Sequence, residues 1–226
     1  MSVYVFDLDD TLYEEITFVR SGFLAVSNYL SDVFGIRSKE AFFFMCRVLE
    51  EKGRGAVFDY TLQYYGIKTQ RNVRKCLSVY RMHSPTITLS SDAEQILRQL
   101  NGNPIYVVTD GNKVVQYNKI RALNLESRLK KYFITHRYGR EHSKPSPYCF
   151  LKIADIEGKH PSDIVYIGDN PNKDFIGIKP LGFRTVQIKR GPFKDVKLTP
   201  SYHAEVEIKT LVELNDVFRI WGWPIK

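Results

Sequence analysis

The chain has 226 residues, of which 43% are hydrophobic and 26% are charged, and its formal net charge is +8 at pH 7. This composition is ordinary for a globular protein and excludes a wholly disordered chain. The length fits one large domain, or a core domain with a smaller one. No apolar run approaches the roughly 20 residues that a membrane-spanning helix needs, so we expect no membrane partner.

The cysteines and the first residues bear on the cellular compartment. Cys46, Cys76 and Cys149 have neither the spacing of a disulfide framework nor that of a metal site. The first ten residues carry acids where a secretory signal would have a basic start and an apolar core. We therefore expect reduced thiols and a cytoplasmic protein.

Basic residues outnumber acidic ones between Lys113 and Lys144. Such a stretch could attract nucleic acid, or it could steer a small anion into a cleft. No nucleic-acid-binding motif accompanies the charge. We therefore interpret the stretch as a solvated basic helix face and do not expect a nucleic-acid partner.

Short apolar segments predict the strands of a parallel sheet, because they do not alternate apolar and polar residues. Helical patterns separate them, one beginning near Ser91 with capping-box spacing to Glu94 and one ending at Gly158. The predicted fold class is α/β, a Rossmann-like open parallel sheet with helices on both faces. The segments are Val3 to Asp7, Ile105 to Asp110, Ile164 to Asp169 and Arg184 to Ile188, with Tyr132 to His136 as a further candidate.

The interval between the first two strands is too long for a simple crossover. Roughly 30 residues suffice for a strand, a helix and the next strand, and this interval is about three times longer. Apolar residues recur every three or four positions from Ile16 to Val33 and from Phe42 to Leu49, which is typical of amphipathic helices. We predict an inserted α-helical cap domain over residues 13–88, and an α/β core domain over residues 1–12 and 89–226.

Acidic and hydroxyl residues follow three of the predicted strands. Asp7 ends the first strand, Thr109 and Asp110 end the second, and Asp169 ends the third. The carboxyl ends of strands in an open parallel sheet share one edge, and ligands bind in the crevice beyond it. We expect one site at this edge, made of Asp7, Asp9, Thr11, Thr109, Lys144, Asp169 and Asp174.

A cluster this acidic needs a positive partner, because neighbouring carboxylates raise one another's pKa. Oxygen ligands without nearby Cys or His favour a hard cation, and Mg²⁺ fits. With Mg²⁺ and Lys144 in place, the site would attract a dianionic phosphate. Donors from Thr109, Gly111 and Asn112 would complete the phosphate cradle.

These residues resemble the four motifs of the haloacid dehalogenase-like hydrolase superfamily, in the same order and structural contexts. The D-x-D-x-T motif is Asp7–Thr11, the second motif is Thr109, the third is Lys144, and the G-D-x-x-x-x-D motif is Gly168–Asp174. The resemblance covers about residues 3 to 190. The insertion point is similar to that of the phosphatase branch with a helical cap after the first strand.

The resemblance implies a Mg²⁺-dependent phosphomonoesterase that acts on a small soluble phosphate ester, a sugar phosphate or a nucleotide, through an aspartyl-phosphate. Asp7 would be the nucleophile, and Asp9 would be the general acid and then the general base. Lys144 and Thr109 would stabilise the transferred phosphoryl group.

The resemblance also implies two sets of ligands. The metal would be held by Asp7, the backbone carbonyl of Asp9, Asp169 and, through water, Asp174. The phosphate would be bound by Thr11, Asp110, Gly111, Asn112 and Lys144. Asp110 departs from the asparagine common after the second-motif Thr in this branch, which leaves the local donor arrangement open.

Alternatives to this phosphatase remain. Asp9 favours a phosphatase over a dehalogenase, because a halide leaving group needs no proton whereas an alkoxide does. A phosphomutase of the same superfamily also needs both acids, and a non-catalytic basic nucleic-acid-binding protein could share the fold. We expect a small-molecule phosphate ester as partner, and a monomer or homodimer; Tyr13, Arg20 and Arg54 are candidate substrate contacts.

Overall fold

The computed structural model of the chain describes residues 2–223, so the first residue and the last three residues of the predicted core domain lie outside the described part. The chain divides into two compact units. One comprises Met1–Glu15 and Thr88–Lys226, and the other is Ile16–Ile87. No helix in the described residues is long and apolar enough to cross a bilayer.

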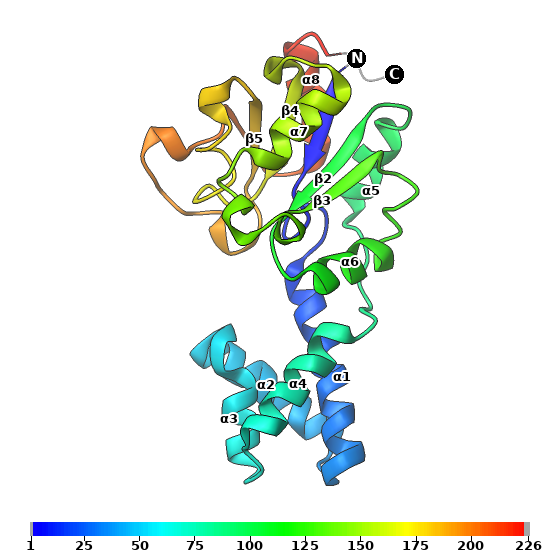
Figure 1. The fold of residues 1–226 in the computed structure, drawn as a ribbon, viewed down its shortest axis with the longest axis vertical. Helices are drawn as coiled ribbons and strands as arrows, with labels where there is room; N and C mark the ends of the chain where they lie inside the picture. The colour runs from blue at the N-terminus through cyan, green and yellow to red at the C-terminus, as the bar shows by residue number, and fades with distance from the viewer. Residues whose placement is uncertain (1, 224–226) are drawn as a thin grey trace. The chain divides into compact units, whose positions relative to one another are not determined.

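The first unit is built on a six-stranded sheet in the order β3-β2-β1-β4-β5-β6, with every neighbouring pair parallel (Figure 1). The predicted fold class and the five predicted strands are confirmed. β6 was not predicted, because it has three residues and only the last is buried. The strands are β1 (Val3–Phe6), β2 (Ile105–Thr109), β3 (Lys131–Ile134), β4 (Ile164–Gly168), β5 (Arg184–Ile188) and β6 (Val206–Ile208).

Helices cover both faces of this sheet. Successive side chains of a strand point to opposite faces, so alternate residues of one strand pack against different helices. On one face, Val3 and Val5 join a core to which α7 (Tyr148–Glu157) contributes Phe150. On the other face, the ring of Tyr4 lies 5.0 Å from that of Phe218. Phe218 belongs to α8 (Leu214–Ile220), and the unit also contains α5 (Ser91–Gln99) and α6 (Lys113–Ala122).

Strand register brings the candidate residues to one edge. Phe6 of β1 pairs with Val107 of β2 and with Ile167 of β4. The strands therefore end at nearly the same level, so that Asp7 and Asp169 follow directly after neighbouring strands. The register of the strands is thus sufficient to place these two acids side by side.

The helix ends agree with the sequence in one case and differ in another. Gly158 caps the carboxyl end of α7 and has the left-handed conformation expected of a glycine at a helix end (φ 57°). The predicted capping box between Ser91 and Glu94 is wrong, because the N-cap of α5 is Ser90. Glu94 pairs instead with Arg128, at 2.7 Å.

The second unit contains α1, which begins one residue before it, and three further helices. The helices are α1 (Glu15–Phe34), α2 (Ser38–Lys52), α3 (Val57–Tyr64) and α4 (Gln70–Met82). Their apolar faces form a core of their own that includes Phe23, Leu30, Met45, Leu62 and Cys76. The apolar residues that recur every three or four positions along these helices therefore pack against one another within this unit.

Replacing Gly177 by Ala should destabilise the first unit. A Cβ at this position would overlap the carbonyl oxygen of Pro145, which follows Lys144, so one of the two segments would have to move. Overpacking of this kind costs about 1–3 kcal/mol of unfolding free energy, to be measured by urea denaturation. Gly55→Ala is the control, because its Cβ would meet nothing within 4 Å. Equal stability of Gly177→Ala and the wild type would contradict the close approach.

Candidate active site

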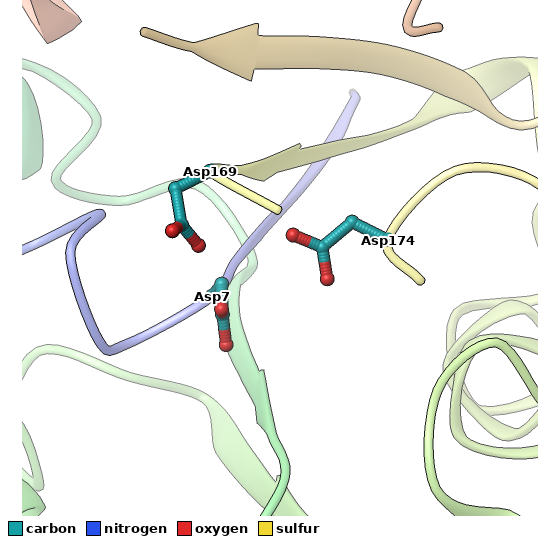
Figure 2. A group of neighbouring side chains, drawn as sticks. All are labelled: Asp7, Asp169 and Asp174. Atoms are coloured by element: carbon teal, nitrogen blue, oxygen red, sulfur yellow. The ribbon is translucent and has the colours of Figure 1, made fainter. Parts of the chain in front are cut away.

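Three buried aspartates lie together at the carboxyl edge of the sheet (Figure 2). Asp7 follows β1, Asp169 follows β4, and Asp174 lies in the loop that continues from Asp169. Each offers one carboxylate oxygen, and these oxygens lie within 4.8 Å of one another. Residues far apart in the sequence therefore form one cluster of oxygen ligands.

Lys144 brings a positive charge into this cluster. Its side chain is only 1% exposed, and its Nζ lies 3.0 Å from Asp7 Oδ1 and 2.8 Å from Asp174 Oδ1. It also donates a hydrogen bond of 2.7 Å to the hydroxyl of Tyr166. Burial opposes the charge, but Asp174 and Asp7 outweigh it and hold the pKa of Lys144 well above its ordinary value.

One ammonium group does not balance the cluster. Burial raises the pKa of Asp7 to about 6, although Lys144 opposes the rise. Burial, together with the carboxylates of Asp7 and Asp174, raises the pKa of Asp169 to about 9. A divalent cation would supply the missing positive charge, and a donor set made only of carboxylate oxygens fits Mg²⁺.

Asp110 holds the loop that carries Lys144. Its Oδ1 accepts hydrogen bonds from the backbone N–H of Lys144 (3.1 Å) and from the hydroxyl of Thr135 (2.8 Å). Its Oδ2 lies 3.0 Å from the ammonium of Lys173. Burial raises the pKa of Asp110, but Lys144, Lys173 and the hydrogen bonds outweigh burial and lower it overall. The carboxylate of Asp110 thus holds the loop that contains Lys144 in position.

The other predicted phosphate ligands have varied surroundings. Asn112 Oδ1 accepts from the backbone N–H groups of Val114 and Val115, so this side chain caps α6. Gly111 has a φ of 132°, a conformation that favours glycine. Thr11 is fully buried, and its hydroxyl has no hydrogen-bond partner among residues 2–223.

Asp9 is surrounded by a different set of donors. Lys119 Nζ lies 2.7 Å from Asp9 Oδ1, and the hydroxyl of Tyr13 donates to the same oxygen. Gln116 Nε2 donates to Asp9 Oδ2 (3.0 Å) and to Thr109 Oγ1 (2.5 Å). Burial raises the pKa of Asp9, but Lys119 and the hydrogen bonds outweigh burial and lower it overall.

Sequence reasoning missed several residues of the site. Lys119 belongs to the stretch interpreted as a solvated basic helix face, and this interpretation is wrong for Lys119 because it is buried. Gln116 is also buried, and the charge pattern gives no sign of it. Their spacing of three residues on α6 places them on one face, and this was the available signal. Tyr166 resembled an ordinary core aromatic. Tyr13, considered as a substrate contact, is fully buried against Asp9.

Comparison with known proteins agrees with the motifs. A family model described as haloacid dehalogenase-like hydrolase matches residues 1–182. The chain belongs to this family. The resemblance predicted from the four motifs is thereby confirmed, and the buried aspartates lie in the matched region.

Individual relatives of this haloacid dehalogenase-like hydrolase match along nearly its whole length. The chain is 27% identical to a glyceraldehyde 3-phosphate phosphatase of Methanocaldococcus jannaschii, over 95% of this chain and 96% of the relative. It is 25% identical to one of Pyrococcus furiosus, over 96% and 92%. A crystal structure of 2-haloacid dehalogenase from Pseudomonas syringae is 20% identical with a TM-score of 0.67, covering 98% of this chain and 99% of that one, which shows a shared fold.

Asp169 should make the metal-free hydrolase lose stability as the pH rises from neutral toward about 9, and Asp169→Asn should weaken this dependence. The pKa of Asp169 is about 9 in the folded protein against an ordinary value of 3.8, so folding takes up a proton between these values. Rising pH therefore disfavours the folded state across that interval. Urea denaturation in a metal chelator at several pH values measures the effect.

Asp155→Asn is the matched control, because Asp155 is an exposed carboxylate on α7. The stability of Asp169→Asn should exceed that of the wild type most clearly at pH 8, whereas Asp155→Asn should follow the wild type. Parallel curves for Asp169→Asn and the wild type would show that Asp169 carries no such penalty.

Proposed function

We propose that the chain is a Mg²⁺-dependent phosphatase that hydrolyses the monoester of a small sugar phosphate through an aspartyl-phosphate on Asp7. The observation that carries the proposal is the buried cluster in which Lys144 contacts Asp7 and Asp174 beside Asp169. The relatives named glyceraldehyde 3-phosphate phosphatase support a three-carbon sugar phosphate as the substrate class. Neither the phosphomutase nor the nucleic-acid-binding alternative gains a comparable observation.

Asp7, Asp169 and Asp174, with the backbone carbonyl of Asp9, are the proposed Mg²⁺ ligands. The three carboxylates are buried and close enough to share one ion. When bound, Mg²⁺ would offset the negative charge of the substrate phosphate and polarise one of its oxygens. The same charge would keep the carboxylate of Asp7 ionised, which a nucleophile requires.

In the first step a carboxylate oxygen of Asp7 attacks phosphorus, and the bond from phosphorus to the alcohol oxygen breaks. The pKa of Asp9 is lowered in the free site, and the negative charge of the bound phosphate would raise it and favour the protonated form. Asp9 then gives its proton to the alcohol oxygen, so the alcohol departs neutral. Lys144 stabilises the charge on the transferred group. Because Gln116 donates to Thr109 Oγ1, the proton of that hydroxyl remains available for a phosphate oxygen.

In the second step water attacks the phosphorus of the aspartyl-phosphate. Asp9, now ionised, takes a proton from this water, and the bond between phosphorus and the Asp7 oxygen breaks. Inorganic phosphate is released and Asp7 returns to its carboxylate form. Asp9 ends protonated and is ready for the next substrate.

The remaining sequence predictions complete the proposal. We propose residues 13–88 as an inserted cap domain that selects the substrate, which the separate helical unit Ile16–Ile87 supports. The thiols of Cys46, Cys76 and Cys149 are free, which supports a cytoplasmic protein. A monomer or a homodimer remains the expected assembly.

Asp7→Asn should abolish hydrolysis, whereas Asp9→Asn should slow both steps by about 10²–10⁴-fold, the usual contribution of a general acid or base. Phosphate release from glyceraldehyde 3-phosphate in the presence of Mg²⁺ measures turnover, and acid quenching after labelled substrate measures the aspartyl-phosphate. Asp7→Asn should trap no label. Turnover in Asp7→Asn equal to that of the wild type would contradict the proposed nucleophile.

Mg²⁺ should raise the melting temperature of the wild type but not that of Asp169→Asn. A ligand at a hundred times its dissociation constant stabilises the folded state by about 2.7 kcal/mol, and the variant lacks one carboxylate ligand. Differential scanning fluorimetry across a Mg²⁺ titration measures the shift without requiring activity. Asp155→Asn again serves as the control, and an equal shift in Asp169→Asn would contradict the proposed metal site.

A further inference from the structure

The donors around Asp9 occupy its two oxygens unequally. Lys119 and Tyr13 both donate to Oδ1, and within residues 2–223 Gln116 is the one donor to Oδ2. Each carboxylate oxygen has two lone pairs that can accept hydrogen bonds. Oδ1 therefore has both acceptor positions filled, whereas the described part of the chain fills one of the two positions of Oδ2.

Lys119 is the strongest of these donors, because a hydrogen bond between charged groups is about twice as strong as one between neutral groups. Its side chain is 3% exposed, and its Nζ lies 2.7 Å from Asp9 and 3.8 Å from Glu15. Burying an ammonium group is costly unless a carboxylate compensates for it. The ammonium and the Asp9 carboxylate therefore fix one another in position.

Gln116 links the oriented carboxylate to the second motif. Its Nε2 reaches both Asp9 Oδ2 and Thr109 Oγ1. The amide thus fixes the distance between the residue that moves the proton and a residue proposed to hold the phosphate. Gln116 and Lys119 lie on the same buried face of α6, so one helix places both donors.

We propose that Lys119 is a positioning residue that orients Asp9, so that proton transfer to the leaving alcohol takes place at Oδ2. The inference rests on the proposed function, in which Asp9 is the general acid. Lys119 does not touch the substrate in this account; it acts through the carboxylate. Losing it would let the Asp9 side chain rotate away from the orientation that proton transfer needs.

The test compares two substrates whose leaving groups differ in their need for a proton. Glyceraldehyde 3-phosphate releases an alkoxide, which needs one, whereas p-nitrophenyl phosphate releases a stable phenolate, which does not. The ratio of kcat/KM for the two substrates reports the help that the first step receives from Asp9. Because the amount of folded enzyme cancels in this ratio, partial unfolding of a variant does not affect it.

Lys119→Met should lower kcat/KM for glyceraldehyde 3-phosphate by about 10- to 100-fold, a range typical of losing a residue that orients a functional group. The loss on p-nitrophenyl phosphate should be at least several times smaller. Lys119→Arg should restore part of the ratio, because the guanidinium also donates to a carboxylate. Tyr13→Phe, which removes the other Oδ1 donor, should shift the ratio in the same direction.

Arg121→Met is the matched control, since Arg121 is an exposed cation on the same helix. It removes the same charge from α6 without touching Asp9, and both rates should stay at the wild-type level. An unchanged ratio in Lys119→Met, with an active wild type, would overturn the positioning role and leave the proposed phosphatase intact. A wild type inactive on both substrates would overturn the phosphatase and this inference together.

Discussion

The contact of Lys144 with Asp7 and Asp174 is the interaction on which the rest of the site depends. Both carboxylates and the ammonium are almost fully removed from water, so each charge would be costly alone. Several parts of the chain act to keep them together. Tyr166 adds a hydroxyl from β4, and Asp110 ties the backbone of Lys144 to the end of β2. The loop with the lysine is thus fixed to the same sheet as the acids.

This arrangement holds more negative charge than its own cation can balance. A core built for stability alone would not place a third carboxylate, Asp169, beside two others, because each raises the pKa of its neighbours. The proposed cation would remove this imbalance, which lowers the stability of the protein without metal. The buried sheet below the site, with every residue of β1, β2 and β4 removed from water, provides the stability that the site lacks.

Local patterns in the sequence predict five of the six strands and the acids that follow three of them. A run such as Val3–Phe6 is buried on both faces, and the parallel sheet brings such ends to one edge whatever their distance along the chain. The environment of Lys119 could not be predicted in the same way. Its burial depends on Asp9, 110 positions earlier, and a count of charges cannot distinguish a solvated lysine from one held by a distant carboxylate. The short strand β6 has no buried apolar run that would predict it. It is a strand because it pairs with β5, and the sequence of β6 alone does not reveal this pairing.

Two carboxylates two residues apart acquire different properties from these surroundings. Asp7 lies among other acids, and its pKa is raised, whereas Asp9 lies among Lys119, Gln116 and Tyr13, and its pKa is lowered. Without metal or substrate, this order is opposite to the one that the proposed roles require. Mg²⁺ beside Asp7 would ionise the nucleophile, and the negative charge of a bound phosphate would favour the protonated form of Asp9. Leu8, which lies between the two aspartates, is fully buried and fixes this segment in the core. The two aspartates on either side of it are thereby held in different surroundings. The difference therefore originates in the fold, because the loops after β1 and β4 surround Asp7 while a face of α6 surrounds Asp9.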